Sequence, residues 1–349
     1  MSKKNSLLLV IVLLAAVLVV LLVFAQTMGN DEPTEPSESQ QASIDTTPSS
    51  GATEATQEST ADTTPSSEAT TPSSEATQPE TQATIPETQP SKPTEPTSPG
   101  VEFGTLYTRA ELEAMDTTEH GYGPGNTSDG KRPPYAQSDQ KKFGKYGGNF
   151  IAPDDNNVYL TFDCGYEYYA TDENGNKYRN TEHILNTLKE KDVKAVFFVT
   201  GQFVREQPDL VQRMIDEGHA IGNHSNRHPV MPQQSIDRMV EEVMTLHNYV
   251  LDKFGYEMTL FRPPTGAFSI QSLAVVQNLG YKNVHWSFAY YDYEPADQPT
   301  TAKAYETITG RHHSGAIYLL HAVSTSNAAV LGQAIDFFRA EGYNLELFR

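Results

Sequence analysis

From residue 158 onward, short and continuously apolar segments alternate with longer ones in which apolar residues recur at helical spacing. Segments 158–162 and 195–199 are almost wholly apolar, whereas Ile184, Leu185 and Leu188 lie one, three and four residues apart. Continuous apolar strands separated by helices are typical of parallel strands that are buried on both faces. The pattern therefore predicts an α/β fold, a distorted parallel (β/α) barrel of about seven units.

The later elements follow from the same periodicities. We expect helices at 210–215, 235–253, 271–279, 301–312 and 331–338, and strands at 220–222, 260–261, 284–288, 316–320 and 343–347. Residues 101–150 are rich in Gly, Pro and Tyr. They are interpreted as a loop-rich lead-in with a short helix at 109–115, placed before a catalytic domain at 151–349.

Residues 26–100 cannot add to the core. They contain no Phe, Trp, Tyr or Leu, are dominated by Thr, Ser, Pro, Glu and Gln, and repeat the sequence of 64–70 directly at 71–77. Such a segment buries too little apolar surface to offset the entropy lost on ordering. We expect a disordered linker that acts as a spacer, with a glycosylated, mucin-like stalk as the alternative.

The start of the chain has the pattern of a membrane anchor. Residues 1–6 include two lysines, and residues 7–25 are an uncharged run of mostly Leu, Val, Ile and Ala. Nineteen residues, rising about 1.5 Å each in a helix, match a bilayer core of about 30 Å. This predicts a transmembrane anchor with its basic end in the cytoplasm and the rest exported, a cleaved signal peptide being the alternative.

The charge balance restricts the partners. The chain has 45 acidic side chains against 25 Lys plus Arg, a formal net charge of −20. Nucleic acid is excluded as a partner, because no basic face exists to neutralise phosphates. No protein partner is inferred. Cys164 is the only cysteine, so an intrachain disulfide is impossible.

Five polar residues follow predicted strands directly or close behind them. In a parallel barrel the carboxyl ends of the strands lie on one face, where such barrels build their active sites. Taken singly, each residue is more often a helix cap or a turn former, but the same placement five times predicts a functional site. These residues are Asp163, His224, Arg262, Asp292 and His321.

His224 and His228 are candidate metal ligands. One helical turn presents residues four positions apart to a single ion, and imidazole nitrogen is a preferred ligand of zinc. Asn223 and Ser225 are placed to cap such a turn. The alternative is a surface helix with two solvated histidines, which Pro229 would shorten.

A second histidine pair, His312 and His313, has a different interpretation. Adjacent residues on a helix point about 100° apart and chelate poorly. We therefore expect a solvated helix end there.

Five segments carry a family resemblance. They are TFDCGYE at 161–167, HSNRH at 224–228, RPPTG at 262–266, YDY at 291–293 and LLH at 319–321. In this order they resemble the signature segments of the polysaccharide deacetylases, the NodB-homology or carbohydrate esterase 4 family. The Gly-Tyr-Glu ending of the first segment, with Trp286 and Ser287 before the fourth, resembles the PdaA-like subgroup that deacetylates muramic acid for the muramic delta-lactam of spore cortex.

The resemblance implies four catalytic roles. Asp163 matches the general base, which takes a proton from a water bound to the metal. Arg262 matches the residue that keeps this carboxylate ionised and oriented. His321 matches the general acid that protonates the leaving amine, and Asp292 the carboxylate that orients its imidazole.

The resemblance also implies a divalent metal, zinc above all, on His224 and His228. Most members have an Asp after the general base as a third ligand, whereas this chain has Cys164. The muramic acid subgroup lacks that Asp too, so activity is not excluded. Cys164 is interpreted either as a thiolate ligand or as a residue that fills space.

Substrate contacts are expected around the mouth of the barrel. Leu319 matches the acetyl-methyl pocket, and Trp286 and Tyr293 match apolar walls, although many members have Trp at the position of Tyr293. For Trp286, a core position is the alternative. Further candidates for substrate binding are Tyr166, Glu167 and Pro264.

The resemblance thus implies a metal-dependent hydrolase that removes N-acetyl groups from peptidoglycan amino sugar, most specifically from N-acetylmuramic acid. It would be tethered to a bacterial cell membrane with its catalytic domain on the wall side. The alternatives are a peptidoglycan N-acetylglucosamine deacetylase, a chitooligosaccharide or xylan deacetylase, and a catalytically dead wall-binding module. Against the last, a binder needs neither an acid nor a base.

Overall fold

The computed structural model describes residues 106–349 except residue 129. The predictions for the basic end, the anchor or signal peptide and the linker lie outside these residues. No helix in the described part of the chain is long and apolar enough to cross a membrane.

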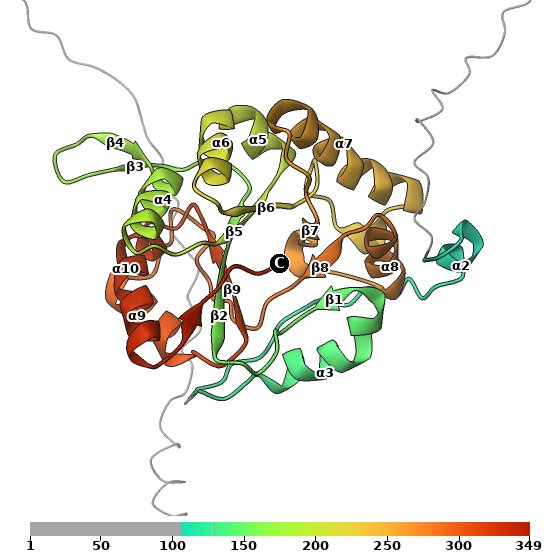
Figure 1. The fold of residues 1–349 in the computed structure, drawn as a ribbon, viewed down its shortest axis with the longest axis horizontal. Helices are drawn as coiled ribbons and strands as arrows, with labels where there is room; N and C mark the ends of the chain where they lie inside the picture. Colours follow the sequence, from blue (N-terminus) through green and yellow to red (C-terminus); the bar gives the residue numbers. More distant parts are fainter. Residues whose placement is uncertain (1–105, 129) are drawn as a thin grey trace, which may run out of the picture. The chain divides into compact units, whose positions relative to one another are not determined.

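A single curved sheet of parallel strands forms the centre of the fold (Figure 1). Backbone bonds from Ser287 to Ile317 and from Leu319 to Phe288 join the segment after the eighth strand to the ninth, so the sheet curls toward closure. Its neighbouring strands are, in order, β1 (Gly148–Asn149), β8 (Lys282–Val284), β7 (Leu260–Phe261), β6 (Ala220–Asn223), β5 (Val196–Val199) and β2 (Asn157–Cys164), and β2 also pairs with β9 (Ala316–His321) and β10 (Asn344–Leu345).

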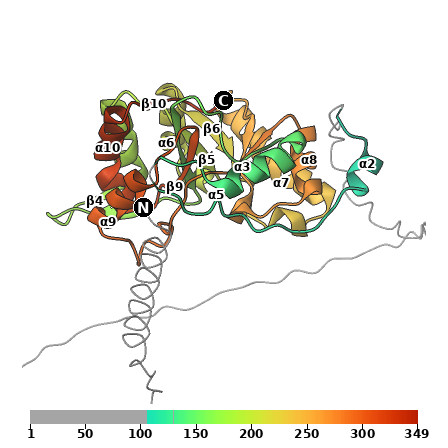
Figure 2. The same ribbon diagram turned by 90° about the horizontal axis from the view of Figure 1, so that it is seen from below.

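Helices lie on the outside of this sheet in both views, and a two-stranded hairpin projects from the edge (Figures 1 and 2). The hairpin consists of β3 (Tyr169–Thr171) and β4 (Lys177–Arg179). The helices are α2 (Arg109–Glu113), α3 (Pro134–Phe143), α4 (Asn180–Glu190), α5 (Gly201–Glu206), α6 (Pro208–Asp216), α7 (Ile236–Phe254), α8 (Ile270–Asn278), α9 (Thr301–Gly310) and α10 (Thr325–Ala340).

The longest of these helices, α7, illustrates how sequence signals set an element. Ser235 caps its first turn by accepting a hydrogen bond from the backbone N–H of Arg238, and Gly255 ends it in the left-handed conformation. Met239, Val243 and other apolar residues at spacings of three and four are buried against the core. Burying each such side chain contributes about 1.5–3 kcal/mol.

Most expected strands and helices are present, with one instructive exception in the sheet. A strand was expected at 284–288, but β8 ends at Val284. The carbonyl oxygens of Val284 and His285 accept hydrogen bonds from the Arg262 side chain rather than from a neighbouring strand. The chain therefore leaves the regular β-ladder at the residues whose carbonyl oxygens accept hydrogen bonds from Arg262.

The lead-in is more regular than expected. Its short helix is present as α2, with a capping box between Thr108 and Glu111. The ten-residue helix α3 was not predicted, because only Ala136 and Phe143 in it are buried and its apolar periodicity is weak. Pro134 at its first position is a typical helix start. The final strand is also shorter than predicted, being limited to β10.

Candidate active site

The parallel register brings the predicted site residues together. Asp163 on β2 lies beside His321 on β9 and beside Phe198 on β5. One strand further, Val199 pairs with Asn223 at the end of β6, so His224 begins the loop next to it. The strand ends thus converge on one edge of the sheet, as the sequence predicts.

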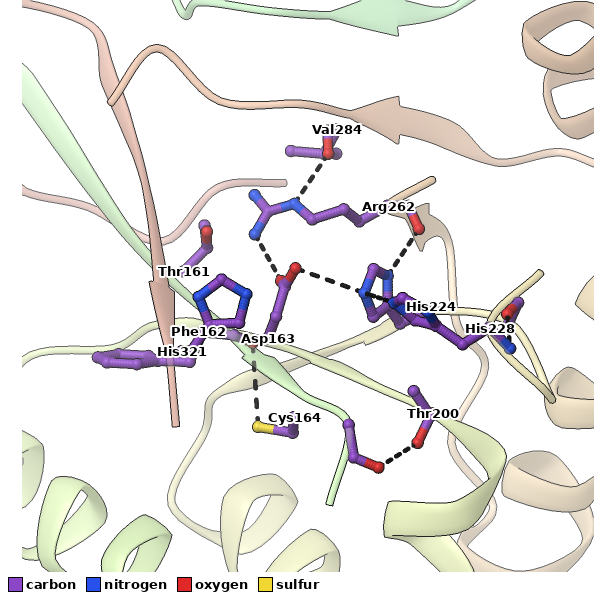
Figure 3. Close-up of polar contacts among 12 residues, drawn as sticks. Thr161, Phe162, Asp163, Cys164, Thr200, His224, His228, Arg262, Val284 and His321 are labelled. Carbon is purple, nitrogen blue, oxygen red and sulfur yellow. Dashed lines mark hydrogen bonds and ion pairs between the residues drawn. The ribbon is translucent and has the colours of Figure 1, made fainter. Parts of the chain in front are cut away.

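Asp163 is fixed by Arg262, and both are buried (Figure 3). Arg262 Nη1 donates to Asp163 Oδ1 at 2.7 Å. Nε and Nη2 donate to the carbonyls of Val284 and His285 at 3.0 and 3.1 Å, and the guanidinium stacks over Phe198 at 4.1 Å. Burial alone would raise the pKa of Asp163, but Arg262 and the nearby histidines hold it below its usual value. The carboxylate is therefore ionised at neutral pH.

His321 forms the second charged pair, with Asp292. Its Nδ1 lies 2.7 Å from Asp292 Oδ1, and its backbone N–H donates to Oδ2 at 2.9 Å. The Asn327 amide also donates to Oδ2. Burial lowers the pKa of His321, but the carboxylate of Asp292 outweighs it and the net shift is upward. Protonated imidazole is thus available for proton donation near neutral pH.

The two histidines of the predicted metal pair meet through a loop rather than a helical turn, which corrects the helical expectation. Ser225 and His228 both have left-handed φ, at 64° and 60°, a geometry that no helix contains. The predicted caps are nevertheless formed. The side chain of Asn223 accepts from Ser225 N–H, and the Ser225 hydroxyl accepts from His228 N–H, each at 2.8 Å.

The donor atoms of this pair fit a divalent cation. Nε2 of His224 and Nε2 of His228 are 3.2 Å apart, and Asp163 Oδ2 lies 3.4 Å from the former. Two nitrogens about 2.0–2.1 Å from one tetrahedral ion lie roughly 3.3 Å apart. His224 Nδ1 contacts the carbonyl of Arg262 at 2.8 Å, which directs the Nε2 lone pair inward.

The ionisation states favour this interpretation. Burial lowers the pKa of His224 to about 4 and also lowers the pKa of His228, so both rings are neutral near pH 7. The described residues contain no group of three His, Cys, Asp or Glu side chains arranged to hold a metal ion. The chain's contribution is thus a histidine pair with a carboxylate close by.

Cys164 does not join this pair. Its side chain is buried in the hydrophobic core beside Phe197 and Val199, and its Sγ lies 4.0 Å from the carbonyl of Phe162 (Figure 3). Burial raises the pKa of the thiol, so the thiolate that a metal requires is disfavoured. Of the two interpretations, the structure places Cys164 as a residue that fills space.

A cavity of about 700 Å³ is lined by Asp163, His224, His228 and His321. Four of the predicted substrate-binding residues line it, namely Tyr166, Trp286, Tyr293 and Leu319. Trp286 packs on Gly266, where a Cβ would approach the indole to 2.4 Å. The other two predicted residues do not line it: Glu167 accepts from the backbone N–H of Thr181, and Pro264 is buried in a short 3₁₀ turn.

Four residues that line the cavity were not singled out from the sequence. They are Thr200, Gln202, Asn226 and Arg227, of which Thr200 directly follows the strand predicted at 195–199. Asn226 and Arg227 lie inside the HSNRH segment, in which only the histidines were assigned a role.

Glu242 was missed because it is a charged residue in the middle of a helix. It is fully buried on α7, and its carboxylate accepts from Arg227 N–H at 2.7 Å and from Arg227 Nε at 2.9 Å. Its backbone carbonyl accepts from Asn226 N–H. Both contacts hold the loop that carries His228.

The expectation of a solvated end at His312 and His313 is wrong for the second residue. His313 is buried, with Nε2 2.8 Å from the hydroxyl of Ser287 and Nδ1 3.0 Å from the carbonyl of Arg311. Burial lowers its pKa to about 4. It ties the start of β9 to the segment after β8, a role that helical spacing does not reveal.

Comparisons with known proteins agree with this geometry. The family profile described as polysaccharide deacetylase matches residues 151–284. Peptidoglycan-N-acetylmuramic acid deacetylase PdaA of Bacillus subtilis is 41% identical over 190 residues, 54% of this chain and 68% of that protein. Peptidoglycan-N-acetylglucosamine deacetylase PgdA of Listeria monocytogenes is 34% identical over 163 residues, 47% of this chain and 34% of that protein.

A comparison with solved structures agrees with the sequence comparison. The solved structure of Bacillus subtilis PdaA, described as a family 4 carbohydrate esterase, superposes with a TM-score of 0.61 at 34% identity. The match covers 66% of this chain and 95% of that one.

Proposed function

This chain belongs to the polysaccharide deacetylase family, and we propose that within it the protein removes the N-acetyl group of muramic acid in peptidoglycan. Family membership makes it an amide hydrolase. The observation that supports the proposed chemistry is the pairing of Asp163 with Arg262 and of His321 with Asp292. Asp163 and His321 lie on neighbouring strands and line the same cavity as the histidine pair.

The base side of the reaction rests on Asp163. Arg262 occupies one carboxylate oxygen, which leaves Oδ2 toward His224 and the cavity. An ionised and oriented carboxylate in this position accepts a proton from the water that attacks the acetamido carbonyl. Because Arg262 is itself held by two carbonyls, Asp163 cannot rotate away without breaking its ion pair.

The acid side rests on His321. Its Nδ1 is engaged by Asp292, so Nε2 is the atom that can donate a proton to the departing amine. Asp292 stabilises the charged imidazole before transfer and fixes the orientation of the ring. Collapse of the tetrahedral intermediate then breaks the C–N bond and releases acetate and the free amino sugar.

His224 and His228 would hold a divalent cation, and we propose zinc because their donors are two neutral imidazole nitrogens. When bound, such an ion supplies Lewis acidity to the acetamido carbonyl and the attacking water. The two residues contribute their Nε2 atoms, and the Arg262 carbonyl fixes the orientation of the His224 ring.

The choice of muramic acid rests on similarity. The match to the muramic acid deacetylase is higher in identity and covers twice the share of the relative that the match to the N-acetylglucosamine deacetylase covers. The free amine of a peptide-free muramoyl unit is placed to close on its own lactyl carboxylate and give the lactam. Deacetylation of N-acetylglucosamine is the second candidate, supported by that weaker match.

We further propose that residues 7–25 anchor the protein in a bacterial cell membrane and that the catalytic domain acts on the wall side. The apolar run supports this proposal, as does a substrate class that lies outside the cytoplasm.

Mass spectrometry of muropeptides tests the function. The full chain is incubated with peptide-free and peptide-bearing glycan, with zinc and with a chelator. We expect loss of acetyl from peptide-free muramic acid, abolished by chelator and by Asp163→Asn, while that variant still binds glycan. Loss from N-acetylglucosamine instead would transfer the activity to the second candidate. Full acetylation of every glycan with every metal would refute the proposal.

A further inference from the structure

A second cavity, of about 350 Å³, adjoins the active-site cavity. On one side it is lined by the lead-in residues 122–126, and on the other by residues that follow β8. Trp286, Ala289, Tyr290 and Tyr293 line both cavities, so the two are neighbours across a shared wall. The second cavity therefore adjoins the cavity that Asp163 and His321 line.

The lead-in is fixed to this wall rather than merely close to it. The Tyr122 hydroxyl donates to the backbone carbonyl of Trp286, and its ring packs edge-on against the indole at 5.2 Å. Arg311 donates to the side chain of Asn126 at 2.7 Å. Gly125 has a φ of 79°, and a Cβ there would come within 2.9 Å of Tyr135. The loop thus has a defined course along the cavity.

The lining is aromatic and carries no charge. It combines Trp286 and four tyrosines with the small residues of the 123–126 segment, and none of the ten lining residues is Asp, Glu, Lys, Arg or His. Tyr291 and Tyr293 are 47% and 55% exposed, with ring centroids 4.7 Å apart at 62°. Exposed aromatic faces with hydroxyl groups suit a neutral sugar ring, whose apolar face packs on aromatics.

We propose that this second cavity is a glycan subsite, which binds the saccharide next to the one being deacetylated. The inference rests on the proposed function, because a polymer whose acetamido group lies between Asp163 and His321 must continue past the shared wall. It assigns a function to the lead-in: residues 122–126 complete the subsite. A charged peptide stem would find no ionic partner in this lining.

Steady-state kinetics of the full chain tests the subsite with Tyr291→Ala, because Tyr291 lines the second cavity and not the first. Peptide-free N-acetylmuramic acid monosaccharide and glycan oligomers are compared as substrates. An aromatic contact contributes about 0.5–1.5 kcal/mol, so the ratio of kcat/KM for oligomer over monosaccharide should fall about two- to tenfold. The loss should lie in KM, since the reacting groups are untouched.

Tyr169→Ala is the matched control, because Tyr169 is 53% exposed on the projecting hairpin. It should leave the ratio at the wild-type value. An unchanged ratio in Tyr291→Ala, or an equal fall in both variants, would overturn the subsite.

A second measurement separates this outcome from failure of the proposed function. Trp286 is the only tryptophan of the chain and lines both cavities, so its fluorescence reports glycan binding without turnover. If wild-type protein deacetylates nothing, oligomers should still bind more tightly than the monosaccharide, and Tyr291→Ala should remove that difference. Equal affinities for both lengths in wild-type protein would refute the subsite.

Discussion

Replacing Arg262 by lysine tests whether a guanidinium, and not merely a positive charge, organises the base side of the site. The three donors of Arg262 point to three separate acceptors: Asp163 and the carbonyls of Val284 and His285. All of this occurs in the fully buried interior, where water cannot replace a lost partner. Lysine keeps the charge but concentrates its donors on one nitrogen.

The magnitude follows from these contacts. A lysine that retains the ion pair with Asp163 loses the two bonds to carbonyl oxygens, and each hydrogen bond to a charged group contributes about 1.5–3 kcal/mol. Arg262→Lys should therefore lower the free energy of unfolding by about 3–6 kcal/mol. A domain is stable by only about 5–15 kcal/mol, so the variant should fold with a small margin.

Urea unfolding, followed by circular dichroism, measures the loss of stability, and acetate release measures turnover. Arg213→Lys is the control, since this partly exposed arginine on α6 bonds to the side chains of Glu217, just after α6, and Asn186 on α4. It should change the free energy of unfolding by less than about 1 kcal/mol. If Arg262→Lys matched the control in stability and kept wild-type kcat, the account of Arg262 as a three-way clamp would be refuted.

Two further predictions concern the loop that carries His228 and the stability of the protein at acid pH. Glu242→Gln should weaken zinc binding roughly tenfold or more in calorimetry, because the buried carboxylate holds the loop of His228 through Arg227. Glu241→Gln is the matched control: this carboxylate also contacts Arg227 but is half-exposed, so affinity should stay unchanged, and equal loss in both would contradict the positioning role. The free energy of unfolding should fall as pH drops from about 6.5 to about 4, because burial lowers the pKa of several histidines, most strongly of four, and the unfolded state then binds more protons. Constant stability in urea titrations across that window would contradict this sign. The four are His219, His224 and His313, each with a pKa of about 4, and His285, with a pKa of about 3.

The sequence predicts site residues where a polar, chemically suitable side chain directly follows an apolar strand. Asp163 and His321 are directly legible, because each polar residue ends an apolar run and parallel strands bring such ends together. The pairing of His224 and His228 was predicted, but the conformation of the loop between them was not. Its two left-handed residues depend on bonds to Asn223 and to Glu242 on α7, and spacing alone cannot encode a contact with a distant helix.

Cys164 shows that the burial of a side chain, too, could not be predicted from spacing alone. The sequence places it directly after Asp163, the proposed general base, at the end of an apolar strand, and leaves open whether its side chain faces the metal site or the core. Side chains alternate along a strand, so Asp163 and Cys164 must point to opposite faces of β2. The direction of Asp163 toward Arg262 therefore decides the direction of Cys164, but only once the partner of Asp163 is located.

The lead-in was the least legible part of the sequence, because its meaning lies in contacts across more than a hundred residues. Tyr122 bonds to Trp286, and Asn126 to Arg311, so neither end of the loop has a local reason for its conformation. If residues 122–126 complete a glycan subsite, the segment that resembles no catalytic signature still controls which part of a glycan strand reaches Asp163. Length selectivity would then depend on residues 122–126 together with the fourth signature segment, and chains that share the five segments but differ in the lead-in would differ in it.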